Sequence, residues 1–152
     1  MSDRRVLAVS SAGGVMLDML ALLDRLEPAQ VRWVAVPMAD TRAGLDGAEV
    51  VWTSELTANS PLGVLRALPR ALRELRRFRP DALISAGTGV AVPYFVAARL
   101  LRIPSAFLET YNVRGRAGSA ARVCGALASV VLVQHKAQLR EHRRAKLVGA
   151  LY

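Results

Sequence analysis

The hydrophobic positions of this chain fall into short, mainly apolar runs that alternate with longer amphipathic segments. The runs are typical of buried strands and occupy residues 6–9, 31–36, 49–53, 82–84, 105–108, 130–133 and 146–148. Helices are predicted between them at residues 15–26, 41–45, 61–79, 119–128 and 136–143, with one more that ends at Leu101. Repeated strand–helix units predict a parallel sheet with helices on both faces, in a Rossmann-like α/β fold. We expect residues 1–152 to form a single domain.

The helix predicted at residues 61–79 is both amphipathic and basic. Its apolar face carries Leu62, Leu65, Leu68, Leu72, Leu75 and Phe78, and another face carries Arg66, Arg70, Arg73 and Arg77. Pro69 predicts a kink or a restart within it. The arginines have two interpretations. They are a solvated surface, or they dock the protein on an anionic leaflet, where each basic residue contributes about 1 kcal/mol.

Two glycine-rich turns follow predicted strands. Gly87-Thr88-Gly89 lies between the apolar run at 82–84 and a helix, and Ser11 with Gly13 and Gly14 follows the first strand. Glycine lets the backbone approach a ligand, and a helix N-terminus directs free N–H groups and a positive dipole end at the same place. The pattern therefore predicts a phosphate site. Gly13 and Gly14 have the alternative interpretation of a tight strand-to-helix turn.

Two carboxylates are the candidate catalytic groups. Asp18 interrupts an apolar helix close to the first glycine turn, where it either faces solvent or accepts a proton. Glu109 ends the strand at 105–108, where it either contacts a ligand or forms a salt bridge with Arg114. The remaining polar or bulky candidates are expected to be structural: His135 and His142 at the surface, Trp33 and Trp52 in the core, and Cys124 as helix packing. Because the histidines and Cys124 lack a ligand spacing, no metal site is expected.

Composition narrows the class of partner. The net charge is +9, and part of the arginine excess is attributable to codon bias. The remainder fits anionic lipid, a diphosphate substrate or nucleic acid, but aromatic platforms for nucleic acid are missing among the basic residues. The lone Cys124 indicates a reducing cytoplasm. The first apolar run ends at Ser10, too soon for a signal peptide, and residues 82–98 contain Gly87, Gly89 and Pro93, which argue against a membrane span.

Taken in order, several motifs resemble the acceptor-side subunit of two-chain UDP-sugar glycosyltransferases. The motifs are Ser10-Ser-Ala-Gly-Gly14, Pro80-Asp81, Gly87-Thr-Gly-Val-Ala-Val-Pro93, Glu109-Thr110 with Arg114 and Ser119, Leu132-Val-Gln134 and Leu147-Val-Gly149. Such pairs add the second N-acetylglucosamine to dolichol diphosphate in eukaryotes, and PssD-type relatives act in bacterial polysaccharide assembly. The chain is also similar, more distantly, to the N-terminal half of the lipid II-forming peptidoglycan glycosyltransferase.

The resemblance implies the acceptor half of a GT-B fold, without a cofactor, peripheral on the inner face of the cell membrane. It implies a lipid-diphosphate-linked sugar as acceptor. It also implies a separate donor-binding chain that holds most of the UDP-sugar, which is UDP-N-acetylglucosamine or a related hexose donor. The residues implied in acceptor or diphosphate binding are Ser11, Gly13, Gly14, Gly87, Thr88, Gly89, Arg114 and Ser119, with Glu109 and Asp18 in catalysis. Val15 stands where the family usually has the histidine proposed as base, so no base is carried over at that position.

Three function classes stay open at this point. The chain is a subunit of an inverting transferase, inactive without its partner; a scaffold that recruits a catalytic chain to the membrane; or an independent nucleotide-binding Rossmann protein. Against the last, Val36-Pro-Met38 stands after the second strand, where an acidic residue would hold a ribose, and Asp40 lies only a little beyond. Because the sequence stops at Tyr152, soon after the strand and glycine at 146–149, we expect the donor domain to be a separate chain.

Overall fold

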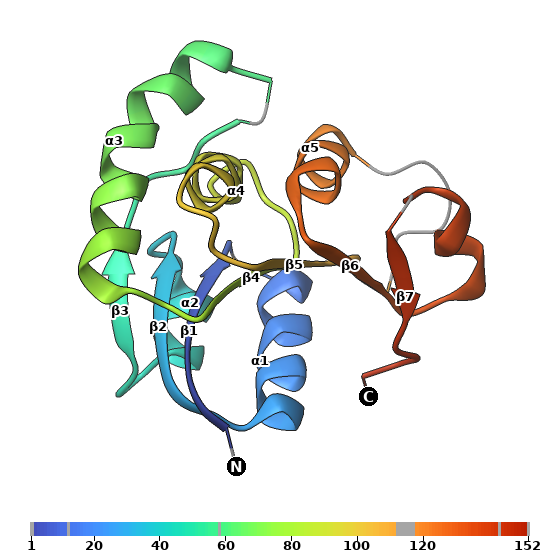
Figure 1. Cartoon of the computed structure of the whole chain (residues 1–152). Helices are drawn as coiled ribbons and strands as arrows, with labels where there is room; N and C mark the ends of the chain where they lie inside the picture. The colour runs from blue at the N-terminus through green and yellow to red at the C-terminus, as the bar shows by residue number, and fades with distance from the viewer. Residues whose placement is uncertain (1, 12, 58, 112–117, 143, 152) are drawn as a thin grey trace.

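A computed structural model describes residues 2–11, 13–57, 59–111, 118–142 and 144–151 (Figure 1). The elements follow the predicted alternation: β1 (Ser2–Ser10), α1 (Gly14–Leu26), β2 (Pro28–Ala35), α2 (Ala39–Gly44), β3 (Glu49–Trp52), α3 (Pro61–Phe78), β4 (Ala82–Ser85), α4 (Ala91–Leu100), β5 (Ser105–Leu108), α5 (Ser119–Leu127), β6 (Val130–Val133), the 3₁₀ helix η1 (Lys136–Arg140) and β7 (Ala145–Leu147). Most boundaries lie within a few residues of those expected. The helix expected at 136–143 is the shorter η1.

The described residues form a seven-stranded sheet in the order β3-β2-β1-β4-β5-β6-β7. Every neighbouring pair is parallel, and Val6 of β1 pairs with Val31 on one side and Ala82 on the other. The chain moves outward from β1 to β3, returns to place β4 beside β1, and then moves outward to β7. The direction of winding therefore reverses between β1 and β4. In open α/β sheets, ligands bind in the crevice outside the carboxyl ends of the strands at such a switch point.

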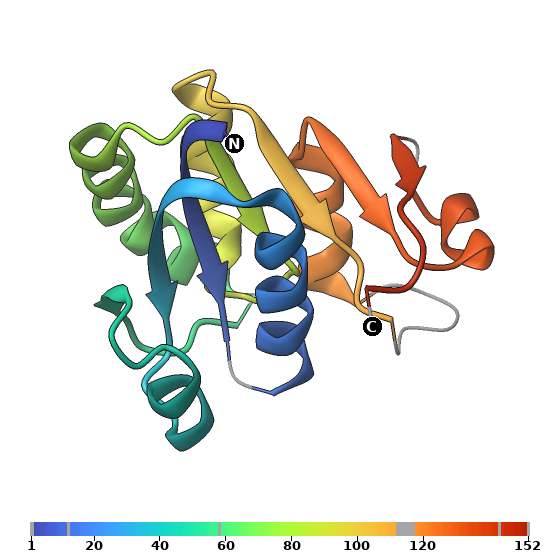
Figure 2. The ribbon, with the colours of Figure 1, turned by 90° about the horizontal axis from the view of Figure 1, so that it is seen from below.

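The sheet lies between two helical layers. Helices α3, α4 and α5 cover one face, and α1 covers the other (Figures 1 and 2). Strand β1 is apolar at successive positions because both of its faces are buried. Leu7 and Val9 belong to the core under α3, α4 and α5, whereas Val6 and Ala8 belong to the core under α1. A parallel strand that is buried on both faces needs apolar residues at successive positions rather than at alternate ones.

Helix α3 is continuous through Pro69, so the restart expected there does not occur. Pro69 is exposed, and the hydrogen bond that proline cannot donate lies on the solvent side of the helix. The Ser60 side chain caps the helix by accepting a hydrogen bond from the Gly63 N–H at 3.1 Å. The expected apolar face is divided. Leu75 and Phe78 lie in the core, but Leu62 and Leu65 are 56% and 64% exposed.

Candidate functional site

The first glycine turn leads from β1 into α1. Gly13 is the N-cap of α1 with φ of 81°, a left-handed conformation that favours glycine. Its N–H donates to Asp40 Oδ2 at 2.7 Å, so this helix start binds a carboxylate from α2. A Cβ added at Gly13 or Gly14 would meet none of the described residues within 4 Å. The turn is therefore open at these two positions, and its Gly13 N–H is already bonded to the Asp40 carboxylate.

The second turn, after β4, is joined to the first by a hydroxyl. Ser85 Oγ donates to the Val9 carbonyl at 2.7 Å and accepts from the Gly87 N–H at 3.2 Å. Gly87 has φ of 81°, and a Cβ placed on it would overlap the ring of Phe107. Core packing is thus sufficient to require glycine at position 87. Thr88 differs, because its Oγ1 is buried and has no hydrogen-bond partner among the described residues. A buried hydroxyl without a partner is a candidate ligand contact.

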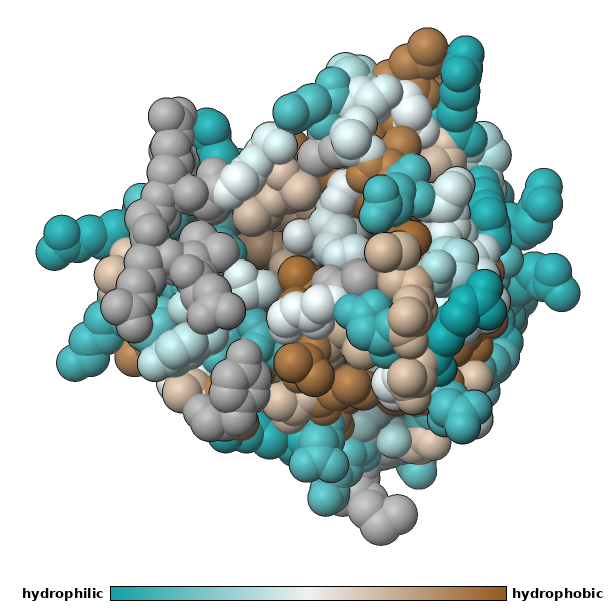
Figure 3. All heavy atoms as spheres, turned by 180° about the vertical axis from the view of Figure 1, so that it is seen from behind, coloured by the Kyte–Doolittle hydropathy of each residue, from teal (hydrophilic) through white to brown (hydrophobic). Residues whose placement is uncertain are grey.

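A cavity of about 390 Å³ lies at the switch point between Ser11 and Thr88, and Gly13, Gly14 and Gly87 do not line it. Its lining comprises Ser11, Val36, Glu55, Leu56, Thr57, Ser60, Thr88, Gly89 and Val90. A neighbouring cavity of about 300 Å³ shares Glu55, Leu56 and Val90 with it and extends to Arg66 and Arg70 of α3. Figure 3 shows the side of the molecule toward which the strands run, where hydrophilic residues gather at the rim around a more apolar centre. The glycine turns are thus connected to the basic face of α3.

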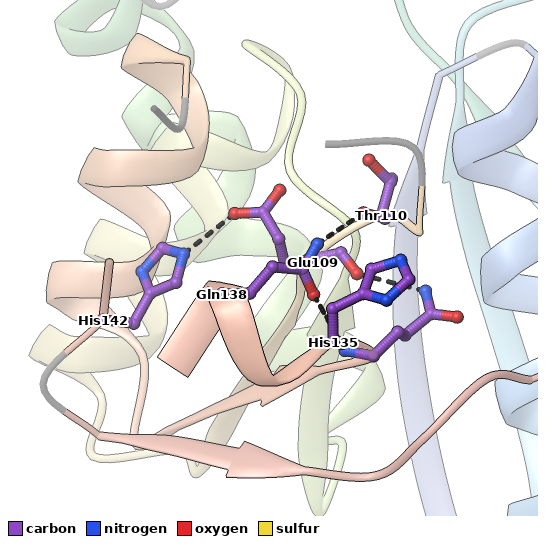
Figure 4. Close-up of polar contacts among 6 residues, drawn as sticks. Glu109, Thr110, His135, Gln138 and His142 are labelled. Atoms are coloured by element: carbon purple, nitrogen blue, oxygen red, sulfur yellow. Dashed lines mark hydrogen bonds and ion pairs between the residues drawn. The ribbon is translucent and has the colours of Figure 1, made fainter. Parts of the chain in front are cut away.

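Glu109, at the end of β5, forms a buried pair with His142 (Figure 4). Its Oε2 lies 2.8 Å from His142 Nε2, and the two residues are 3% and 8% exposed. The expectation that His142 is a surface residue is therefore wrong. Arg114, the partner expected for Glu109, lies outside the described residues. Gly125 of α5 makes room for the histidine, because a Cβ there would lie 2.7 Å from His142 Nδ1. The sequence gives no periodic signal for this contact.

Asp18 is buried at 2% exposure and does not face solvent. Its Oδ2 accepts hydrogen bonds from the Tyr111 N–H at 3.3 Å and from Gln134 Nε2 at 3.4 Å. Gln134 Nε2 also lies 3.1 Å from the Glu109 carbonyl oxygen. Asp18 therefore holds the backbone that follows β5, next to Glu109. A positioning role for Asp18 is consistent with these contacts, and its catalytic role stays a prediction.

Two further residues fix the same segment and were not predicted from the sequence. Gln138 Oε1 accepts from the N–H groups of Gln134 and His135, and its Nε2 donates to the Thr110 carbonyl at 2.9 Å. His135 Nε2 lies 3.0 Å from the Tyr111 carbonyl oxygen. Residues that follow β6 thereby clamp residues that follow β5. The clamp links segments far apart in the chain, so local patterns do not reveal it.

The other expected site residues lie on α5 and α3, and of the four arginines only Arg66 and Arg70 line the neighbouring cavity. Ser119 begins α5 and is exposed, while Arg66, Arg70, Arg73 and Arg77 are all exposed on α3. Arg70 Nη2 donates to the Trp52 carbonyl at 2.9 Å. Across the part of the chain that the structure describes, no helix is long and apolar enough to cross a membrane, and no group of three His, Cys, Asp or Glu side chains is placed to hold a metal ion.

Two buried groups in the helical layer are poor nucleophiles. Burial raises the pKa of the Cys124 thiol to about 12 and that of the Tyr94 phenol to about 12. Both therefore remain protonated at neutral pH, and Cys124 packs in the core as expected from the sequence. The chemistry available at the switch-point cavity is consequently that of hydroxyls, backbone N–H groups and the carboxylate of Glu55, whereas Asp18 and Glu109 lie outside its lining.

No family model matches the chain. It is similar to UDP-N-acetylglucosamine–N-acetylmuramyl-(pentapeptide) pyrophosphoryl-undecaprenol N-acetylglucosamine transferases. The protein from Parasynechococcus marenigrum is 30% identical over 82% of this chain and 38% of its own length. The protein from Nitrosococcus oceani is 29% identical over 98% of this chain and 44% of its own length. This chain thus spans less than half the length of these relatives.

Solved structures agree on the fold. MurG from Acinetobacter baumannii has a TM-score of 0.77 at 23% identity, over 95% of this chain and 45% of that one. Alr3699/HepE from Anabaena, solved with UDP and glucose, has a TM-score of 0.72 at 14% identity, over 96% and 44%. The chain has the Rossmann-like architecture of the N-terminal half of GT-B enzymes, and it is homologous to that half of MurG-type transferases.

Proposed function

We propose that this chain is the acceptor-binding subunit of a two-chain, inverting UDP-sugar glycosyltransferase. The carrying observation is homology over 98% of this chain to the Nitrosococcus oceani transferase, whose name specifies a pyrophosphoryl-undecaprenol acceptor. The acceptor here is a sugar joined by a diphosphate to a polyprenyl lipid. A separate chain binds the UDP-sugar, UDP-N-acetylglucosamine or a related hexose donor, and covers the cleft. The PssD-type assignment in polysaccharide biosynthesis is part of the same proposal.

The diphosphate binds in the cavity between the two glycine turns. Thr88 supplies a hydroxyl whose Oγ1 lacks a partner among the described residues, and Ser11 and Gly89 line the same cavity. The N-terminus of α4, which begins at Ala91, directs its positive dipole end to the turn that contains Gly89. These groups provide hydrogen bonds and partial positive charge that favour an anion, against the charge of Glu55, which also lines this cavity.

Glu109 orients the hydroxyl of the acceptor that attacks the donor sugar. Support comes from its place at the carboxyl end of β5 and from the bond between its Oε2 and His142, which restricts the carboxylate to one orientation. Asp18 assists by fixing the backbone at Tyr111. Ser119 and Arg114 contribute acceptor contacts in the same proposal.

Helix α3 docks the subunit on the inner face of the cell membrane. Leu62 and Leu65 are both exposed and lie within one helical turn of each other, and the exposed Arg66 follows Leu65. Apolar side chains flanked by arginine suit the boundary between headgroups and acyl chains of anionic lipids. The cavity that reaches from Arg66 and Arg70 toward Val90 connects this docking face to the diphosphate cavity.

A scaffold without catalytic groups is the second candidate. It is favoured by the partners already present in the site: Asp40 accepts from the Gly13 N–H, Asp18 holds the Tyr111 N–H, and Glu109 is paired with His142. In a scaffold these contacts are purely structural. The two candidates differ in whether changes at Thr88 or Glu109 affect turnover or only stability.

The decisive test replaces Thr88 with valine in the chain reconstituted with its donor-binding partner. Valine keeps the shape of threonine but lacks the hydroxyl, and removing a buried hydroxyl without a partner costs no stability. We expect at least about a tenfold loss of kcat/KM for the lipid-diphosphate acceptor, corresponding to about 1.4 kcal/mol, with an unchanged or raised free energy of unfolding.

The matched control is Thr41→Val. Thr41 is fully buried and its Oγ1 donates to the Val36 carbonyl at 2.6 Å; Thr41 itself does not line the cavity, although Val36 does. This variant should lose about 1 to 3 kcal/mol of stability and keep its specific activity. Glu109→Gln should likewise reduce turnover more than melting temperature. Full activity of both Thr88→Val and Glu109→Gln would favour the scaffold.

A further inference from the structure

A second polar cavity lies away from the glycine turns, between α5 and the segment that joins η1 to β7. Its volume is about 390 Å³, and its lining consists of Arg122, Gly125, Ala126, Glu141, His142 and Arg144. Two arginines and a histidine thus face one carboxylate across the same space. This excess of positive charge is absent from the lining of the diphosphate cavity, so the two sites differ in kind.

The two arginines are available to bind an anion. Over the residues that the structure describes, the ion pairs are Arg32–Glu49 and His142–Glu109, neither of which includes Arg122 or Arg144. Both arginines are exposed. Guanidinium groups donate paired hydrogen bonds that match the oxygens of a phosphate group, and they are more weakly hydrated than ammonium groups.

His142 joins this cavity to Glu109. Its Nε2 lies 2.8 Å from Glu109 Oε2, and its ring packs edge-on against Phe107 with centroids 5.7 Å apart. Its Nδ1 lies on the side of Gly125, which also lines the cavity. When Nε2–H donates to the Glu109 carboxylate, Nδ1 is the ring atom left to interact with an anion. A hydrogen bond from Nδ1–H to a bound anion and the Nε2–H bond to Glu109 are then made by one ring, so binding at one side bears on the other.

We propose that Arg122, His142 and Arg144 form a binding site for a phosphate group, and that its occupancy is transmitted through His142 to Glu109. The phosphate comes from a phospholipid headgroup or from a soluble phosphate ester. The cavity continues through Arg122 and Ala126 into an apolar hollow of about 490 Å³ that includes Val123 and Leu127, which leaves room for an attached apolar group. This site goes beyond the proposed transferase function, and its test requires no glycosyl transfer.

The test uses the two histidines of the chain as reporters. The full chain is titrated with sulfate, a tetrahedral dianion of constant charge near neutral pH, at constant ionic strength maintained with chloride. The ring-nitrogen signals of His142 and the side-chain carboxyl signal of Glu109 should shift together and saturably, while those of His135 stay in place. Arg122→Gln and Arg144→Gln should each weaken sulfate binding about tenfold. Arg99→Gln, an exposed arginine on α4 outside the cavity lining, should leave it unchanged.

Two further probes separate the sources of phosphate. Saturable shifts with glycerol 3-phosphate identify a soluble ester. A phospholipid headgroup is identified if Arg122→Gln binds phosphatidylglycerol vesicles more weakly than Arg99→Gln does. The two variants should then bind phosphatidylcholine vesicles equally. The proposal is overturned if none of these probes moves the His142 signals, or if Arg99→Gln weakens sulfate binding as much as Arg122→Gln. A shift of His142 without one of Glu109 would overturn the transmission step.

Discussion

At the scale of single residues, Phe107 lies between the second glycine turn and the Glu109–His142 pair. Its ring occupies the space that a Cβ at Gly87 would need, and it packs edge-on against the ring of His142. One fully buried aromatic side chain therefore sets the backbone of the second glycine turn and one side of the Glu109–His142 pair. Aromatic pairs in this geometry add about 0.5 to 1.5 kcal/mol beyond the burial of their surface.

The first prediction compares two glycines. Gly87→Ala should lower the free energy of unfolding by about 2 kcal/mol or more, because the new methyl group overlaps Phe107 and φ is 81°. Gly14→Ala should change it by less than about 1 kcal/mol in the stabilising direction, since α1 begins there with free space around the Cβ position. Urea unfolding measures both. Equal losses in the two variants would show that Phe107 does not determine the turn.

The sequence predicted some of these residues and not others, for physical reasons. Ser11, Thr88 and Gly89 are found together because strand ends in a parallel sheet share an edge, which local patterns reveal. The partner of Glu109 was not predicted, because His142 lies in a charged stretch without periodicity and reaches Glu109 only after η1 and the start of β7 fold back. Likewise, Asp18 was not expected to be buried, since its partners Tyr111 and Gln134 come from distant segments.

At the scale of elements, α3 combines two surfaces in one helix. Its C-terminal half packs Leu75 and Phe78 into the core, while Leu62 and Leu65 near its N-terminus are exposed. The hydrophobic periodicity predicted the helix and its apolar face correctly. It could not divide that face, because the division depends on how far the helix extends beyond the sheet.

The second prediction concerns this exposed end. Replacing both Leu62 and Leu65 with glutamine should weaken binding to phosphatidylglycerol vesicles about tenfold or more, while the free energy of unfolding changes little. Flotation of vesicles measures the binding, which should also fall at high salt. Leu100→Gln is the control, because Leu100 is 63% exposed at the C-terminal end of α4. Equal effects of the Leu62/Leu65 and Leu100 variants would remove α3 as the docking element.

The third prediction follows from the burial of Tyr94 on α4 and Cys124 on α5. Their pKa values rise from 10.0 and 9.0 to about 12, so the unfolded state loses its protons first as pH increases. The stability that these groups give in full below pH 9 is therefore lost between pH 9 and 12, by up to about 7 kcal/mol in total at about 1.4 kcal/mol per pKa unit. Denaturant unfolding at each pH measures the decline. Cys124→Ala should remove the part that begins near pH 9, and an unchanged pH slope in that variant would contradict the prediction.

At the scale of the whole molecule, the fold class was predictable from the sequence, and the order of the strands in the sheet was not. Alternating apolar runs and amphipathic segments were sufficient to predict a parallel sheet with helices on both faces, and the structure confirms it. The order of the strands is a consequence of long-range pairing, which single segments do not encode. The proposed diphosphate cavity lies at the switch point between β1 and β4.

The fourth prediction is that the purified chain alone transfers no sugar from UDP-sugars and binds UDP weakly. A GT-B site requires a second domain to hold the nucleotide at its own helix N-termini. Activity should appear on addition of a separate donor-binding chain and a polyprenyl-diphosphate-linked sugar. Isothermal titration with UDP and a radiolabelled transfer assay measure the two properties. Tight UDP-sugar binding with turnover by this chain alone would refute the two-chain arrangement.

The central place of β1 has a consequence during synthesis on the ribosome. Strand β1 pairs with β2, which follows it closely, and with β4, whose first residue, Ala82, is made some 70 residues after β1 ends. At about 5 to 20 residues per second, one edge of β1 stays unpaired for roughly 4 to 14 seconds after it has been translated. An apolar strand with an open edge is prone to pair with other chains. Chaperone demand and aggregation of nascent chains should therefore peak before residues 82–85 emerge from the ribosome.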